Sequence, residues 1–170
     1  MRHIFIVTLA ALALAACGKA GEHGAASVSR DDPSCALIGD ATALFGAGAQ
    51  HFGYPGLDTM AGTCEFISAD GKRSADIISY TAESLHGVTP EAQMQTVTTA
   101  WDAQTETPLA AIANLGDAAQ IATDLPGYQT QIAFRKGGTL VLISARSGDE
   151  SITGEQLARN MATAAAAHVR

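Results

Sequence analysis

An apolar run at the start of the chain constrains the fold most, because it divides the 170 residues into a leader and a domain. After the basic start Arg2-His3, residues 4–16 are apolar except for Thr8. A membrane-spanning helix needs about 20 apolar residues, whereas a shorter run after a basic start is typical of a signal peptide. We therefore expect residues 1–16 to be removed and the rest of the chain to be exported.

The apolar run ends on Leu14-Ala15-Ala16-Cys17, which resembles the lipobox of bacterial lipoproteins at all four of its positions. The resemblance implies cleavage before Cys17, whose thiolate sulfur would take a diacylglycerol, and two or three acyl chains anchor a protein stably. Gly18 stands where an aspartate would resemble an inner-membrane retention signal, so the periplasmic face of an outer membrane is favoured if the host has one. An ordinary secretory signal is the alternative, and it also exports the chain.

Residues 17–32 are predicted to be the lipidated cysteine and a flexible tether, because they are mostly small or polar and show no hydrophobic periodicity. Residues 33–170 then form a single domain. The chain has 10 Lys+Arg against 17 Asp+Glu, a formal charge of −7. An acidic chain without a basic cluster argues against nucleic acid as a partner, since phosphate contacts supply most non-specific affinity. The membrane is therefore expected as a partner only through the lipid on Cys17.

Two further cysteines, Cys35 and Cys64, remain once Cys17 is lipidated. An even pair in an exported chain predicts a disulfide. Closing a loop of about 30 residues would stabilise the fold by about 3 to 4 kcal/mol in the chain-entropy account. A metal site is the alternative, but His51 is the only histidine between the cysteines, and this set does not resemble a zinc site. No metal is expected.

Helical spacing and capping residues predict three helices. The first covers residues 34–45, where Gly39 is a point at which it could break. The second begins at Thr89-Pro90, an N-cap followed by a proline in the first turn, and ends before Pro108. The third opens with the capping box at residues 153–156.

Runs rich in β-formers and bounded by turn residues predict five strands. Asp70-Gly71 joins strands 63–68 and 75–81 into a hairpin, because Asp-Gly suits a tight turn. An antiparallel meander is expected over residues 118–123, 128–134 and 139–145, whereas no regular element fits residues 46–58. The order α-β-β-α-β-β-β-α predicts an α+β fold, with an antiparallel sheet of about five strands, three helices and one disulfide.

Four short motifs span the predicted domain: Cys35-Ala-Leu-Ile, Leu44-Phe45-Gly46, Cys64-Glu-Phe66 and Leu115-Gly116-Asp117-Ala118. Together they resemble a group of small exported bacterial lipoproteins and related extracytoplasmic sensor-type domains, over residues 35 to 145. The resemblance implies that the two cysteines pair and that an antiparallel sheet carries helices on one side. It implies no activity.

Catalytic patterns are missing from the sequence. It contains no Gly-x-Ser-x-Gly turn to present a nucleophile, and no Gly-x-Gly-x-x-Gly or Walker-type loop to hold a phosphate. Asp149 and Glu150 are adjacent acids, and paired acids do glycoside chemistry only on either side of a sugar, so a solvated turn is expected there. Solvent exposure is likewise expected for the histidines His23, His51, His86 and His168. We therefore expect no enzyme activity and no cofactor.

The best binding candidates are His51, Phe52 and Tyr54, which place two aromatics in a Gly-punctuated segment between the paired cysteines. Loops on a rigid frame often carry binding, and packing of the two aromatics against a sheet edge is the alternative. The sequence thus favours an accessory or sensor-like interaction module of the cell envelope, which binds through the open sheet face or through residues 46–58. One alternative is a carrier of a small ligand or lipid. Another is a cell-wall hydrolase, or an inhibitor of one, with Asp149 and Glu150 in a concave site.

Overall fold

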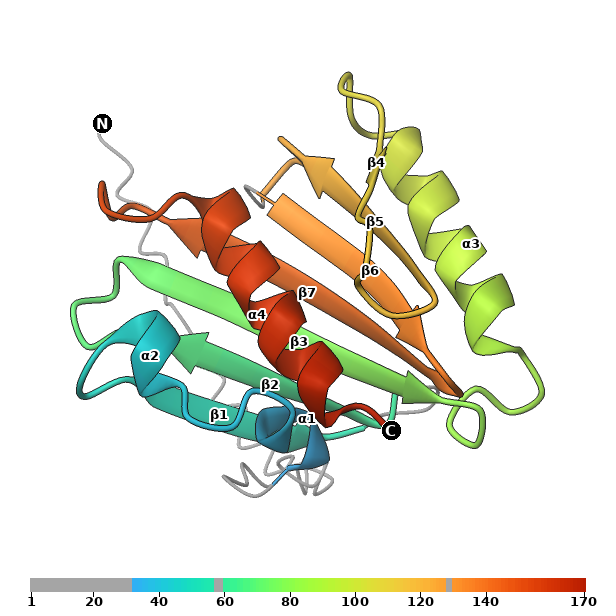
Figure 1. Cartoon of the computed structure of the whole chain (residues 1–170), viewed down its shortest axis with the longest axis horizontal. Helices are drawn as coiled ribbons and strands as arrows, with labels where there is room; N and C mark the ends of the chain where they lie inside the picture. The colour runs from blue at the N-terminus through green and yellow to red at the C-terminus, as the bar shows by residue number, and fades with distance from the viewer. Residues whose placement is uncertain (1–31, 57–59, 128–129) are drawn as a thin grey trace, which may run out of the picture.

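A computed structural model describes residues 32–56, 60–127 and 130–170 (Figure 1). In these residues, seven antiparallel strands form one sheet in the order β1-β2-β3-β7-β6-β5-β4. The strands are β1 (Gln50–Pro55), β2 (Gly62–Ile67), β3 (Arg73–Thr81), β4 (Ala110–Ala111), β5 (Ala118–Thr123), β6 (Thr130–Lys136) and β7 (Thr139–Ser147). The helices are α1 (Pro33–Ala36), α2 (Thr42–Phe45), α3 (Pro90–Asp102) and α4 (Gly154–His168). The predicted α+β class, the antiparallel sheet and the Cys35–Cys64 disulfide are confirmed.

The predicted hairpins form where the turn residues stand. β2 and β3 pair around the Asp70-Gly71 turn, with Ile67 opposite Ser74. The two longest strands, β3 and β7, then pair along their whole length at the centre of the sheet, where Ile77 lies opposite Ile143. This pairing joins residues far apart in the chain and holds the two meanders together.

The count of five strands and three helices is wrong, since the described residues contain seven strands and four helices. β1 lies within residues 46–58, where no regular element was expected, because Gly53 and Pro55 obscure its pattern. An edge strand tolerates a proline at its end, since that residue needs no ladder donor, and β2 supplies the pairing partner. The other additional strand, β4, has only two residues.

The predicted first helix is two short helices. Gly39 breaks it, because its φ of 65° lies in the left-handed region that favours glycine. Asp32 caps the first piece: its side-chain Oδ1 accepts a hydrogen bond of 2.8 Å from the Ser34 amide. The chain thus turns between α1 and α2 instead of continuing as one rod.

Helices cover both faces of the sheet, so the one-sided arrangement implied by the resemblance is wrong. On one face α4 lies across the sheet, with α1 and α2 on the same side (Figure 1). Its Leu157 and Met161 are fully buried in the same core cluster as Ile143. On the other face α3 packs over β5, β6 and β7, where its Met94 and Trp101 belong to a second cluster. Residues 140–143 of β7, which are all apolar, are therefore covered on both sides of the sheet.

Candidate functional site

The three predicted binding residues lie in the edge strand β1 and not in a loop. Successive side chains of a strand point to opposite faces, so the trio is divided. His51 lies on the side of the sheet that α1, α2 and α4 cover, called here the helix-covered side, where its ring is 5.8 Å from that of Phe66. Phe52 and Tyr54 lie together on the opposite side of the sheet and are half-buried. The alternation of the strand, which could not be assigned from the sequence, thus separates the histidine from the aromatics.

The side of the sheet that carries Phe52 and Tyr54 is called here the open face. The register places Phe52 opposite Glu65 of β2, and Glu65 opposite Asp76 of β3. All these side chains are half-buried. None of the described helices packs on this side of β1 and β2, because α3 lies over β5, β6 and β7. By strand alternation, the residues of β1 to β3 on the open face are Gln50, Phe52, Tyr54, Thr63, Glu65, Ile67, Ser74, Asp76, Ile78 and Tyr80, and Arg146 of β7 lies on the same side opposite Ser74.

Two carboxylates meet at the middle of the open face. Glu65 and Asp76 are direct cross-strand partners, and like charges in that position repel. Partial burial, and then the charge of Glu65, raise the pKa of Asp76 above its ordinary value, while Arg146 opposes this rise. The open face therefore combines two half-buried aromatics on the edge strand with two carboxylates at its middle.

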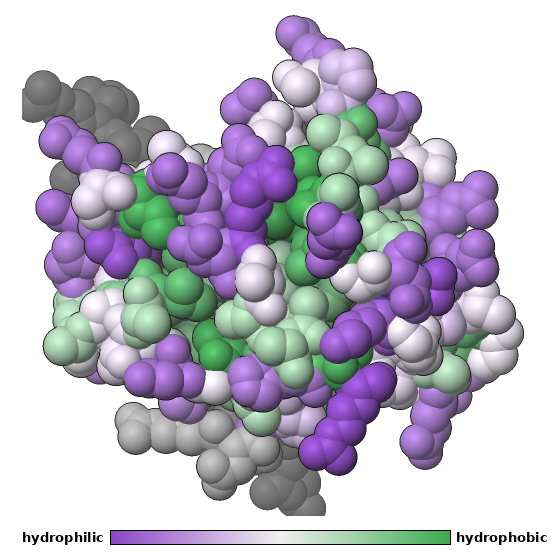
Figure 2. Space-filling model, in the orientation of Figure 1, coloured by the Kyte–Doolittle hydropathy of each residue, from purple (hydrophilic) through white to green (hydrophobic). Residues whose placement is uncertain are grey.

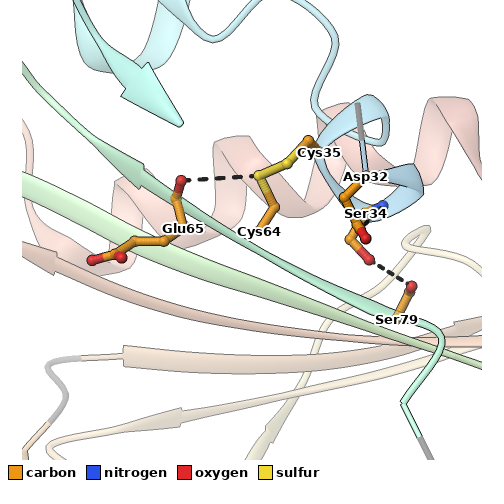
Figure 3. Close-up of a disulfide and its surroundings, with 6 residues drawn as sticks. All are labelled: Asp32, Ser34, Cys35, Cys64, Glu65 and Ser79. Atoms are coloured by element: carbon orange, nitrogen blue, oxygen red, sulfur yellow. Dashed lines mark hydrogen bonds between the residues drawn. A yellow bond between two sulfur atoms is a disulfide. The ribbon is translucent and has the colours of Figure 1, made fainter. Parts of the chain in front are cut away.

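The disulfide lies on the other, helix-covered side of the sheet. Cys35 of α1 is bonded to Cys64 of β2, with a Cα–Cα distance of 5.0 Å. Next to it, the Ser34 hydroxyl lies 2.8 Å from that of Ser79 on β3 (Figure 3). Ser34 and Cys64 are fully buried. These contacts attach the first described residues firmly to the sheet directly behind the open face.

Asp149 and Glu150 line the same surface hollow, together with Asp124 and Glu155, but their contacts differ. Arg73 donates to Asp149 Oδ2 from Nε at 2.9 Å and from Nη2 at 2.6 Å. The Ser151 amide, together with Arg73, holds the pKa of Asp149 well below its ordinary value. Arg73 also donates to the Leu44 carbonyl at 2.8 Å, while Glu150 is exposed. Asp149 thus belongs to an ion pair that links β3, the segment after β7 and the end of α2.

Arg73 is the residue of this ion pair that sequence reasoning missed. It stands 76 positions from Asp149, and no local pattern relates the two. Only the pairing of β3 with β7 brings the two residues together, because it places Arg73 opposite Ser147, two residues before Asp149.

Metal-ligating groups do not gather in the described part of the chain: no cluster of three or more His, Cys, Asp or Glu side chains could hold an ion there. Among the predicted histidines, His86 and His168 are exposed and His51 is half-buried. Cys17 and His23, the predicted lipid and tether residues, lie outside the described residues, as do residues 1–16.

No described helix combines the length and the apolar character needed to cross a membrane. Comparison of the chain with protein-family models, with curated proteins and with solved structures gives no match.

Proposed function

We propose that the protein is a lipid-anchored module of the bacterial cell envelope that binds a protein partner and performs no catalysis. The anchor is the lipid on Cys17, and residues 18–31 act as the tether. The open face is the binding surface, and the partner is a protein segment that combines lysine or arginine with apolar side chains. The observation that carries the proposal is the pair of aromatics beside two opposed carboxylates on a part of the sheet that the described helices leave uncovered.

The chemistry of the open face supports a basic partner. Glu65 and Asp76 repel each other, and burial makes ionisation of Asp76 unfavourable. A cation between the two carboxylates would relieve both costs, since an opposite charge within about 4 to 6 Å favours the ionised form. Phe52 lies beside Glu65 in the next strand, and an aromatic ring attracts a cation further. The overall charge of −7 favours encounter with a basic partner as well.

The contacts of Asp149 favour this proposal over the cell-wall hydrolase alternative. Its carboxylate is engaged by Arg73 and by the Ser151 amide, whereas a hydrolase would need two carboxylates facing a sugar from either side.

Site-specific photocrosslinking in living cells tests the binding surface. A photoreactive phenylalanine analogue replaces Tyr54 of the full chain, and the same analogue at Ala103, exposed at the end of α3, is the matched control. We expect one discrete crosslinked protein from position 54 and none from position 103. The crosslink should weaken at least about tenfold on Glu65→Lys, since charge reversal of a paired ion costs more than 1.4 kcal/mol.

The control substitution for charge is Glu91→Lys, which changes an exposed acid in the first turn of α3 and should leave the crosslink unchanged. A crosslink that survives Glu65→Lys contradicts the acidic recognition. Crosslinks that appear equally at position 103 contradict the open face as the binding surface.

Cell fractionation tests the anchor separately. The full chain is expected in the membrane fraction, and the Cys17→Ser variant is expected to leave it, because the proposal assigns all membrane attachment to the acyl chains. Retention of the Cys17→Ser variant in membranes contradicts the lipid anchor and leaves the crosslinking test unaffected.

A further inference from the structure

We infer that a cavity on the helix-covered side of the sheet binds a small organic anion with an apolar body. This inference does not depend on the open face, which lies on the other side. The cavity has a volume of about 500 Å³, within the range of small-molecule sites. It lies between α4 and the segment that follows β4, residues 112–116.

One wall of the cavity is a single face of α4. Arg159, Thr163 and Ala166 line it, and their spacing of four and three residues places them in one row along the helix. Ile112 and Leu115 line the opposite wall. Figure 2 shows hydrophobic surface beside α4 at the centre of this view, bordered by hydrophilic side chains. The cavity is therefore an apolar hollow with a polar rim.

The wall opposite α4 is fixed before any ligand arrives. The Ile112 amide donates to the Ala119 carbonyl at 3.0 Å, and the Asp117 amide donates to the Arg135 carbonyl at 2.7 Å. Gly116, with φ of 68°, lies so close to the Arg135 carbonyl that any side chain there would meet it. Leu115 is buried in the main core. A wall attached to the sheet at both ends loses little entropy on binding, which favours affinity.

The charges that line the cavity are all positive. Lys136 and Arg159 contribute them, and none of the lining residues is acidic, although the chain as a whole carries −7. The Lys136 ammonium and the Arg159 guanidinium are both held in place by hydrogen bonds. Lys136 Nζ donates to the Ala166 carbonyl at 2.7 Å, and Arg159 forms an ion pair with the carboxylate of Glu155 one helical turn away, in which Nε donates to Oε1 at 2.8 Å.

Each cation keeps hydrogen-bonding capacity for an anion. An ammonium has three donors and a guanidinium has five, more than these contacts use. A carboxylate or phosphate can therefore bind at the rim by charge-assisted hydrogen bonds, while the apolar part of the same ligand contacts Ile112, Leu115 and Ala166. Two kinds of ligand combine an anionic group with an apolar body in this way: a fatty acid from the membrane and a soluble aromatic carboxylate.

Methyl NMR titration of the full chain in lipid nanodiscs tests the inference. The probes are octanoate and 2-naphthoate, each matched by its uncharged alcohol, 1-octanol or 2-naphthalenemethanol, and empty nanodiscs give the partition of each probe into lipid. We expect at least one anion to shift the methyl signals of Ile112, Leu115 and Ala166, with affinity at least about fivefold above that of its alcohol. Octanoate alone would identify the lipid source, and 2-naphthoate alone the soluble source.

Three variants separate the site from general effects of charge. Arg159→Gln and Lys136→Gln should each weaken anion binding at least about threefold, and Thr163→Trp, which places a large ring over the hollow from an exposed helical position, should abolish it. Arg146→Gln removes an equal charge on the opposite side of the sheet and should leave anion binding at the cavity unchanged.

Four results overturn the inference. These are absence of methyl shifts with both anions, equal affinity for the anion and its alcohol, undiminished binding by Thr163→Trp, and an equal loss on Arg146→Gln. The open-face proposal is read out by crosslinking at position 54, so either proposal can fail while the other stands.

Discussion

Asp76 and Glu65 impose a cost on the folded protein, because two carboxylates lie directly opposite each other on neighbouring strands. The folded-state pKa of Asp76 lies above its ordinary value of 3.8. A carboxyl whose pKa is raised on folding favours the folded state when protonated, and this contribution is lost as the pH rises above 3.8. At neutral pH the pair therefore opposes folding.

Replacing Asp76 by asparagine should consequently stabilise the protein at pH 7 by about 0.2 to 1 kcal/mol, the range for cross-strand pairs. The gain should shrink as the pH falls from neutrality through the raised folded-state pKa towards 3.8, and it should vanish below 3.8, where the native aspartic acid is neutral in both the folded and the unfolded state. Thermal unfolding at several pH values measures it. Glu106→Gln, which removes an equal charge at an exposed position, is the matched control and should leave the melting temperature at pH 7 unchanged. A loss of stability for Asp76→Asn at pH 7 would show that Arg146 outweighs the repulsion.

Asp149 has the opposite effect on stability, because the Ser151 amide and Arg73 favour its charged form. A carboxylate with a lowered folded-state pKa contributes stability above its ordinary value of 3.8, and this contribution is lost as the pH falls through the lower folded-state value.

The Asp149→Asn variant should therefore have a lower melting temperature than the native chain at pH 7, and the two should converge as the pH falls well below 3.8. Thermal unfolding across that range is the measurement. The Glu150→Gln variant, at the adjacent position, leaves the hydrogen bonds between Asp149 and Arg73 intact and should melt like the native chain. A pH-independent difference for Asp149→Asn would assign its effect to packing instead of charge.

Among the elements, α1 depends most on one covalent link. It has only four residues, so hydrogen bonds within it contribute little, and Cys35 ties it to β2. The disulfide spans a sequence separation of 29 residues, which limits the freedom of the unfolded chain. It therefore stabilises both the start of the domain and the sheet edge that carries the open face.

Cys35→Ala and Cys64→Ala should each lower the free energy of unfolding by about 3 kcal/mol, and the double variant should lose no more than the worse single one. Denaturant titration measures the three values. Treatment of the native chain with a reductant is the matched control, and it should lower the free energy of unfolding by the same amount as either single variant. Additive losses would show that the two sulfurs contribute through separate packing contacts.

At the scale of the whole molecule, the strands of the sheet differ in how well neighbouring strands and helices protect them from local opening. β3 and β7 form its centre, and β7 is covered by helices on both faces. β1 and β4 are the two outermost strands of the sheet, and β4 has only two residues. Local opening is expected to be easiest where few buried contacts must break.

Hydrogen exchange should therefore be slowest for the amides of β3 and β7 and fastest, among the strands, for those of β1 and β4. Mass spectrometry of exchanged peptides measures the order. Cys64→Ala should accelerate exchange in β1 and β2 before it affects β6, since the disulfide lies at that side of the sheet. Uniform protection across the seven strands would contradict a hierarchy of stability.

The sequence by itself determined features that depend on neighbouring residues. The Asp70-Gly71 hairpin, the Thr89 cap of α3 and the capping box of α4 follow from local hydrogen bonds and backbone preferences. The pairing of Cys35 with Cys64 could be predicted because these are the two cysteines that remain when Cys17 is assigned to the lipid. Tertiary structure decided the rest, because β1 is a strand only through its pairing with β2, and strand alternation alone separates His51 from Phe52 and Tyr54. The placement of α3 opposite α4, the Arg73–Asp149 ion pair and the cavity beside α4 depend on the β3–β7 pairing and on packing between distant segments, which no local pattern encodes.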